Sequence, residues 1–467
     1  MKASPPLRLS LLASALLTAS TVLAQNPGPM PGRPAPATPK PVGSMPPLPP
    51  LPPLPPTGGT NQPPQPPPQG DLPPPPPDPN DNSGKVPAQR PKHKLNGPAP
   101  RPAGHLGDPL PGLTTDQLND FVAGLAEFQA VETPESGLGP IFNNTSCAIC
   151  HSAPAIGGSS ATLVTRFGTM NGGHFDPLAA LGGSLLQSQA IDPAALEKVP
   201  AEATIVVHRQ STPLFGAGLI EAIPDATIQA LAQQRKPDGV VGRPAMITDV
   251  VSGQTRVGRY GWKAQQATLL AFAGDAYLNE MGITNRFFPT ENAPNGDLAL
   301  LAQFDKVADP EDVVDPFTGK SDIDAAADFM RLLAPPAPPR PSGTTQMGMN
   351  VFNQLGCAVC HVPVLMTGPS KIHALDRKPV WLFSDLLLHD MGSLNDEIEQ
   401  AGALGNEMKT APLWGLKFSA PYLHDGRAPT IADAIRGHDG EGAASRDRFN
   451  KLTTSQQREL LNFLNTL

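Results

Sequence analysis

The four cysteines of the chain form two short pairs of identical spacing, and this repetition limits the fold more than any other feature. The pairs are Cys147-Ala-Ile-Cys150 and Cys357-Ala-Val-Cys360, and each is followed directly by a histidine, His151 or His361. In a C-x-x-C-H motif, the two thiols bond to the vinyl groups of haem and the histidine ligates the iron. The sequence therefore predicts two covalently bound haems c, whose macrocycles fill much of the interior.

Three other uses of paired cysteines are weaker. A thioredoxin-like redox pair needs no following histidine and more often lies in a βαβ unit. A zinc site with four thiolates, joining the two pairs, would leave both histidines unexplained. Structural disulfides are compatible with an exported chain. The complete motif occurs twice, which favours haem over all three alternatives.

The N-terminus has the layout of a secretory signal over residues 1–24. Lys2 and Arg8 precede an apolar run, and Ala24 provides a small residue for cleavage. The run is shorter than the roughly 20 residues that span a bilayer, although a retained anchor is the alternative. We therefore expect a periplasmic protein that is cleaved after Ala24 and has no stable membrane insertion.

Residues 25–105 are dominated by proline, including the runs 46–56 and 73–77. Proline fixes φ and lacks an N–H, so this stretch is predicted to be a disordered linker of polyproline II character. A docking site for a proline-binding partner is the alternative interpretation. The remaining chain is long enough for two domains, predicted as an N-terminal haem c domain at 106–335 and a C-terminal one at 336–467.

The net charge of −8 and the absence of a basic cluster argue against nucleic acid as a partner. A small basic redox protein of the periplasm is the favoured electron donor or acceptor.

Helix signals outnumber strand signals, so we predict a mainly α fold with long loops. A helix is expected over 344–355, and another over 454–467 with Thr453 and Gln456 spaced as a capping box. Further capped helices are expected after Thr114, Ser321 and Thr430. Phe142 and Phe352 each lie five residues before a motif, which supports two related haem domains resembling cytochrome c.

Several segments outside the cysteine motifs resemble the bacterial di-haem c-type oxidoreductase family, described as putative peroxidases. They are residues 137–143, 213–224, 258–264, 385–392 and 411–416, and residues 422–428 are similar to the wider di-haem cytochrome c peroxidases. The resemblance covers about Leu113 to Leu467 and implies an oxidoreductase with two haems.

The resemblance also implies an iron ligand at His438, fourteen residues after His424. With His361 below the ring, it would give a low-spin iron of comparatively low potential. Met391 is the competing ligand, and a helix-capping role for His438 is the alternative. For the first haem, His174, His208 and Met170 are all available, and no spacing selects one of them.

Peroxide chemistry requires an acid–base group near an open iron. We expect Glu221 in this role, because a carboxyl in the apolar stretch 218–223 would have a raised pKa. A structural salt bridge is the equal alternative. The resemblance places Arg209 near the same pocket, where it would pair with a haem propionate or stabilise charge on oxygen.

Trp262 lies between the two haem motifs in the sequence and is a candidate electron relay, with plain packing as the alternative. Asp238-Gly239 and Asp275 could contribute to a calcium site, but the set of oxygen ligands is incomplete and no such site is assigned.

Two functions of different class follow. In the first, the protein is a peroxidase-like enzyme in which electrons pass from a C-terminal bis-His haem to an N-terminal catalytic haem, which reduces hydrogen peroxide or a related small substrate. In the second, both irons are six-coordinate and the protein is a non-catalytic electron-transfer cytochrome.

Overall fold

The computed structural model describes residues 105–307, 312–316, 318–340 and 342–467. The predicted signal segment and nearly all of the predicted linker lie outside the described residues. Within the described ranges, no helix combines the length and apolar character that crossing a membrane requires.

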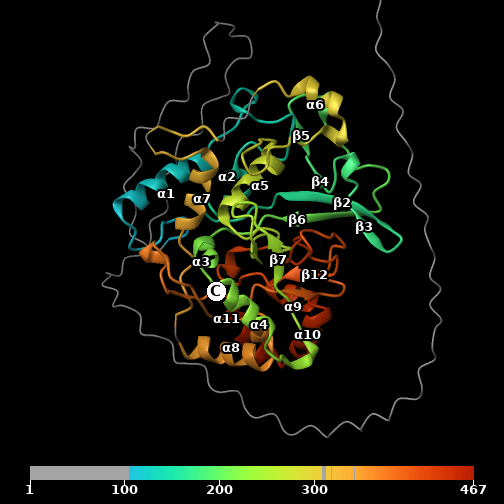
Figure 1. Cartoon of the computed structure of the whole chain (residues 1–467). Coiled ribbons are helices and arrows are strands. Elements are labelled where there is room, and N and C mark those ends of the chain that lie inside the picture. Colours follow the sequence, from blue (N-terminus) through green and yellow to red (C-terminus); the bar gives the residue numbers. More distant parts are fainter. Residues whose placement is uncertain (1–104, 308–311, 317, 341) are drawn as a thin grey trace, which may run out of the picture. The chain divides into compact units, whose positions relative to one another are not determined.

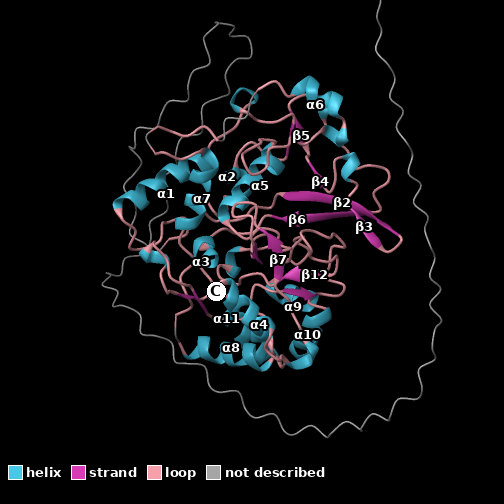
Figure 2. Cartoon of the chain, in the orientation of Figure 1, coloured by secondary structure: helices cyan, strands magenta, loops and turns pink. Residues whose placement is uncertain are grey.

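Helices provide most of the regular structure (Figure 2). They are α1 Thr115–Phe128, α2 Cys147–Cys150, α3 Ala217–Glu221, α4 Asp225–Ala232, α5 Leu269–Met281, α6 Leu298–Phe304, α7 Asp322–Leu332, α8 Gly343–Gln354, α9 Ile431–Gly437, α10 Ala443–Asn450 and α11 Thr454–Leu464.

The predicted starts of four helices are confirmed, because each helix begins directly after the capping residue that the sequence predicts. Thr114, Ser321 and Thr453 each form a capping box at the start of α1, α7 and α11, and the Thr430 side chain accepts a hydrogen bond from the Asp433 N–H of α9. Helix α11 ends at Leu464, three residues earlier than predicted. Local side-chain caps therefore define these ends, as the sequence suggests.

Strands are more extensive than the sequence indicates. They are β1 Ile141–Phe142, β2 Leu163–Asn171, β3 His174–Asp176, β4 Leu185–Leu186, β5 Gln189–Ala190, β6 Ile205–Gln210, β7 Ala245–Thr248, β8 Thr255–Gly258, β9 Leu365–Met366, β10 Pro379–Val380, β11 Leu388–Asp390 and β12 Glu407–Lys409. The main sheet is antiparallel, with β2 paired to β6 on one edge and to β3 and β4 on the other. The sequence does not predict strand β2, because its buried residues are consecutive and do not alternate with exposed ones.

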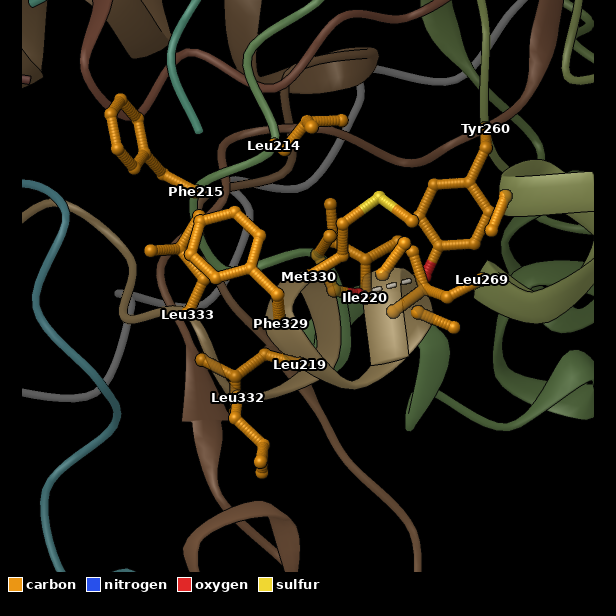
Figure 3. Packing of buried hydrophobic residues seen from close by; sticks show 14 of the residues in the cluster. Leu214, Phe215, Leu219, Ile220, Tyr260, Leu269, Phe329, Met330, Leu332 and Leu333 are labelled. Atoms are coloured by element: carbon orange, nitrogen blue, oxygen red, sulfur yellow. Dashed lines mark hydrogen bonds between the residues drawn. The ribbon is translucent and has the colours of Figure 1, made fainter. Parts of the chain in front are cut away.

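The larger core joins helices α1, α3, α5 and α7. The rings of Phe121 and Phe128 in α1 pack at a tilt against Phe329 of α7, at centroid distances of 5.3 and 4.7 Å. The end of α7 packs beside Leu219 and Ile220 of α3 (Figure 3). Residues from the C-terminal part of the chain, such as Leu382 and Trp414, belong to the same core.

A second core forms between α8, α9, α10 and α11, which gather in one region of Figure 1. Phe352 of α8 lies edge-on to Phe383 and to Phe463 of α11. Phe142, its counterpart before the first motif, is in strand β1 instead of a helix. The sequence repeat therefore does not extend to the secondary structure before the motifs.

Candidate haem sites

Each cysteine motif folds as a single helical turn followed by its histidine. The first forms α2, and the second forms a 3₁₀ turn over Cys357–Val359. The Nδ1 of His151 lies 2.9 Å from the Gly158 carbonyl oxygen, and the Nδ1 of His361 lies 3.0 Å from that of Phe383. Because a carbonyl oxygen only accepts, each Nδ1 donates, and Nε2 is left for a metal.

The cysteines are free thiols that lie in two separate cavities, so they form neither disulfides nor one four-thiolate site. Burial raises the pKa of both Cys147 and Cys357 to about 12. A thioredoxin-like pair instead requires a thiol with a lowered pKa. The thiol environment therefore disfavours the redox-pair alternative and is compatible with haem attachment.

The cavity around the second motif places His438 opposite His361. Their ring centroids are 6.4 Å apart, and the His438 Nδ1 lies 2.8 Å from the Ala434 carbonyl oxygen. A metal–imidazole bond is about 2 Å long, so this separation is close to what one iron between two imidazoles requires. Met391 lines the same cavity. Burial lowers the pKa of His361 to about 4, which keeps its imidazole neutral as a ligand must be.

The cavity around the first motif contains no histidine besides His151 among its described lining residues. It holds two carboxyl groups of helix α5, Asp275 and Glu280, and Met281 and Met330 also line it. Burial raises the pKa of both carboxyls. Neither acid was predicted as an acid–base group, and Asp275 was considered only for calcium, although both interrupt an otherwise apolar helix, the same signal that singles out Glu221.

Two buried polar atoms without a hydrogen-bond partner belong to residues that line this first cavity. They are Nη2 of Arg209 and Oε1 of Gln265. The Arg209 Nη2 is only 2.7 Å from Asp396 Oδ2, so the two form an ion pair without hydrogen-bond alignment. Buried polar groups are rarely left unpaired, and a carboxylate oxygen of a bound group would satisfy the Arg209 donor, whereas the Gln265 oxygen is an acceptor and needs a donor. The residues therefore fit haem with its propionates.

Glu221 lines neither cavity. Its Oε1 accepts a hydrogen bond from the Leu269 N–H at 2.8 Å, and its Oε2 pairs with the Arg331 guanidinium at 2.7 Å. This placement matches the structural alternative, because the carboxyl joins α3 to α5 and α7, and the catalytic role of Glu221 stays a prediction. The structural alternative describes it better.

None of the three predicted sixth-ligand candidates for the first haem lines its cavity. His174, His208 and Met170 lie on strands β3, β6 and β2 with exposed side chains, and His208 contacts the Thr165 hydroxyl. The sequence order after Cys150 was therefore a poor guide to proximity.

Trp262 lines both cavities. Its indole N–H donates to the Gln210 carbonyl oxygen at 2.8 Å, and its ring lies edge-on to His424 at 6.2 Å. The other residues shared by the two cavities are Gln210, Ser211, Thr212, Leu214, Gly261 and Phe272. These residues form the wall between the two sites.

The residues considered for calcium are not brought together. Asp238 pairs with Arg448 at 2.7 Å, and Asp275 lies in the first cavity.

Comparison with known proteins gives one family match. The model of the family described as di-haem oxidoreductase, putative peroxidase, matches residues 195–467, which begin after the first cysteine motif. No curated protein matches the chain.

Solved structures give low similarities. The hydrazine synthase of Kuenenia stuttgartiensis is 16% identical, with 79% of this chain and 98% of that chain covered and a TM-score of 0.36. The diheme peroxidase BthA of Burkholderia thailandensis is 14% identical, with 75% and 86% covered and a TM-score of 0.33. A MauG-like protein associated with microbial copper homeostasis is 17% identical, with 58% and 92% covered and a TM-score of 0.27. Because the family model matches more than half of its residues, the chain belongs to the di-haem oxidoreductase family of putative peroxidases.

Proposed function

We propose that this protein is an exported, periplasmic di-haem peroxidase with one haem c in each cytochrome c-like half. Thioether bonds at Cys147, Cys150, Cys357 and Cys360 would hold the haems. When bound, they would supply the redox chemistry, with electrons from a small redox protein entering at the second motif and reaching hydrogen peroxide at the first. The observation that carries this proposal is the unequal supply of side chains in the two cavities.

The second cavity supplies ligands for both faces of an iron. His361 and His438 face each other with Nδ1 of each held by a carbonyl oxygen, which fixes their rings. We assign His438 as the sixth ligand over Met391 for this reason. A fully ligated site suits electron entry and has no open position for a substrate.

The first cavity supplies acids in place of a second imidazole. Reduction of hydrogen peroxide to two waters consumes two electrons and two protons. Glu280, which its raised pKa keeps protonated to higher pH, would donate one proton to the departing peroxide oxygen as the O–O bond breaks, and would deliver the second proton after being reprotonated from solvent. Its Oε2 accepts a hydrogen bond from the Asn143 side chain at 2.9 Å, which orients the carboxyl.

Arg209 and Trp262 have supporting roles in this proposal. The Nη2 of Arg209, which forms an ion pair with Asp396 but has no hydrogen-bond partner, would bind a propionate of the first haem, as expected from the sequence. Trp262 stands in the wall shared by both cavities, where an indole would help electrons to cross.

Electron paramagnetic resonance of the ferric protein tests the proposal. We expect one high-spin and one low-spin signal, with the high-spin signal lost on adding hydrogen peroxide and peroxide consumed in the presence of a reductant. Two low-spin signals that are indifferent to peroxide, before and after one-electron reduction, would instead identify an electron-transfer cytochrome.

A further inference from the structure

A charged network lies beside the second cysteine motif and has no part in the function proposed above. Its centre is His389 of strand β11, whose side chain is 2% exposed and lines the second cavity. The Nδ1 of His389 is 3.8 Å from the sulfur of Cys360.

Both ring nitrogens of His389 face carboxylates. Nδ1 lies 2.6 Å from Glu441 Oε2, and Nε2 lies 3.1 Å from Asp385 Oδ2. A neutral imidazole has only one N–H, so both hydrogen bonds form only when the ring is a cation. Burial lowers the pKa of His389, but the bonds to Asp385, Cys360 and Glu441 outweigh burial and raise it to about 11.

The surrounding backbone and charges hold this arrangement in place. The Asp385 N–H donates to the Cys360 carbonyl oxygen at 2.8 Å, and the Asp385 carboxylate pairs with Lys236 at 2.8 Å. Glu441 accepts a hydrogen bond from the Val241 N–H at 3.1 Å. At Gly242, with φ +60, a Cβ would lie 2.5 Å from the His389 ring, so only glycine leaves room for it.

We propose that His389 is a positioning residue that holds a fixed positive charge against the Cys360 sulfur and thereby raises the reduction potential of the second haem. A nearby cation stabilises the ferrous state relative to the ferric state, and charge and hydrogen bonds to sulfur are established means by which proteins set such potentials. The effect would offset part of the low potential that bis-imidazole ligation gives. The inference rests on the proposed attachment of haem at this motif.

Two variants with opposite expected signs test the inference in the full-length, haem-loaded protein. His389→Gln removes the cation and leaves the carboxylates of Asp385 and Glu441, with Lys236 paired to Asp385 and the buried Lys409 acting on Asp385 through its charge. At a fixed applied potential, it should lower the ferrous-to-ferric ratio of the second haem about tenfold, which is about 59 mV for one electron. Glu441→Gln removes an anion and should raise that ratio. His373→Gln, outside both cavities, is the matched control.

Spectroelectrochemical titration measures the reduction potentials of both haems, and the first haem serves as the internal reference. Shifts of the second haem in opposite directions support the inference. Shifts in the same direction would show a general loosening of the site, and ratios within twofold of wild type would show no electrostatic effect; either result overturns the inference. Mass spectrometry and the pyridine haemochrome spectrum separately report whether two haems are attached, so failure of the proposed function is seen independently.

Discussion

The two haem cavities differ in what the protein has placed around them. The second presents two imidazoles to one position, and a network of paired charges from Lys236, Asp385, His389 and Glu441 lies beside it. The first presents one imidazole, two carboxyls with raised pKa and two polar atoms without a hydrogen-bond partner. Two facing imidazoles suit a site that only changes charge, whereas buried acids suit one that passes protons to a substrate.

The largest effect is expected at the first cavity, from Glu280→Gln. Loss of a positioned acid–base group should lower peroxide turnover by about 10²-fold or more, because such groups contribute roughly 10² to 10⁴. Steady-state peroxide consumption with a reductant measures it. Glu221→Gln is the matched control and should remain within twofold of wild type. If the two variants behave alike, Glu280 is not the proton-transfer group.

The pH dependence should come from the same carboxyl. Burial raises the pKa of Glu280 above the usual range of a glutamate, so the protonated acid persists to higher pH. If the free enzyme requires that acid, kcat/KM should fall, by up to about tenfold per pH unit, once pH rises above the raised pKa. Glu280→Gln should lack this limb of the pH profile. A limb that survives in the variant belongs to another group.

At the second cavity, His438→Ala should change the spin state of the second haem iron, because peroxide reduction is proposed at the first haem. Removal of one imidazole leaves the iron with His361 alone, so its low-spin signal should become high-spin. Electron paramagnetic resonance of the ferric variant measures the change, and His373→Ala is the control. An unaltered spectrum would rule out His438 and direct attention to Met391, which lines the same cavity.

The features that could be predicted from the sequence are those set by short-range chemistry. Thr114, Ser321 and Thr453 cap helices through residues three positions away, so a local pattern carries the whole interaction. The same holds for C-x-x-C-H. His438 was reached only through the family resemblance, because its partner His361 is far away in the sequence.

The features that could not be predicted depend on contacts between distant segments. Glu280 is oriented by Asn143, 137 residues away, and Glu221 meets Arg331 across 110 residues. Both acids lie in apolar stretches, and only the packing of α5 and α7 decides which faces a cavity. Strand β2 likewise depends on β6, whose pairing partners lie about forty residues along the chain.

A smaller effect is expected in the wall between the cavities. Trp262→Phe removes the indole and its hydrogen bond to Gln210 but keeps an aromatic ring. Reoxidation of the second haem by peroxide should slow in stopped-flow experiments, by less than the effect of Glu280→Gln. Trp381→Phe, at a tryptophan that lines neither cavity, is the control. Equal rates in both variants would leave Trp262 as a packing residue.

The smallest effect on activity, and a measurable one on stability, is expected from Glu221→Gln. The carboxylate receives the Leu269 N–H and the Arg331 guanidinium, so it ties three helices together. Glutamine keeps one acceptor but turns an amide NH₂ toward Arg331, leaving donors face to face. Because the pair is partly exposed, the free energy of unfolding should fall by only about 1–2 kcal/mol. Urea unfolding measures it, with the exposed Arg436→Gln as a control that should change far less. Unchanged stability together with lost peroxide turnover would restore Glu221 to the chemistry and remove the contrast between the two acids.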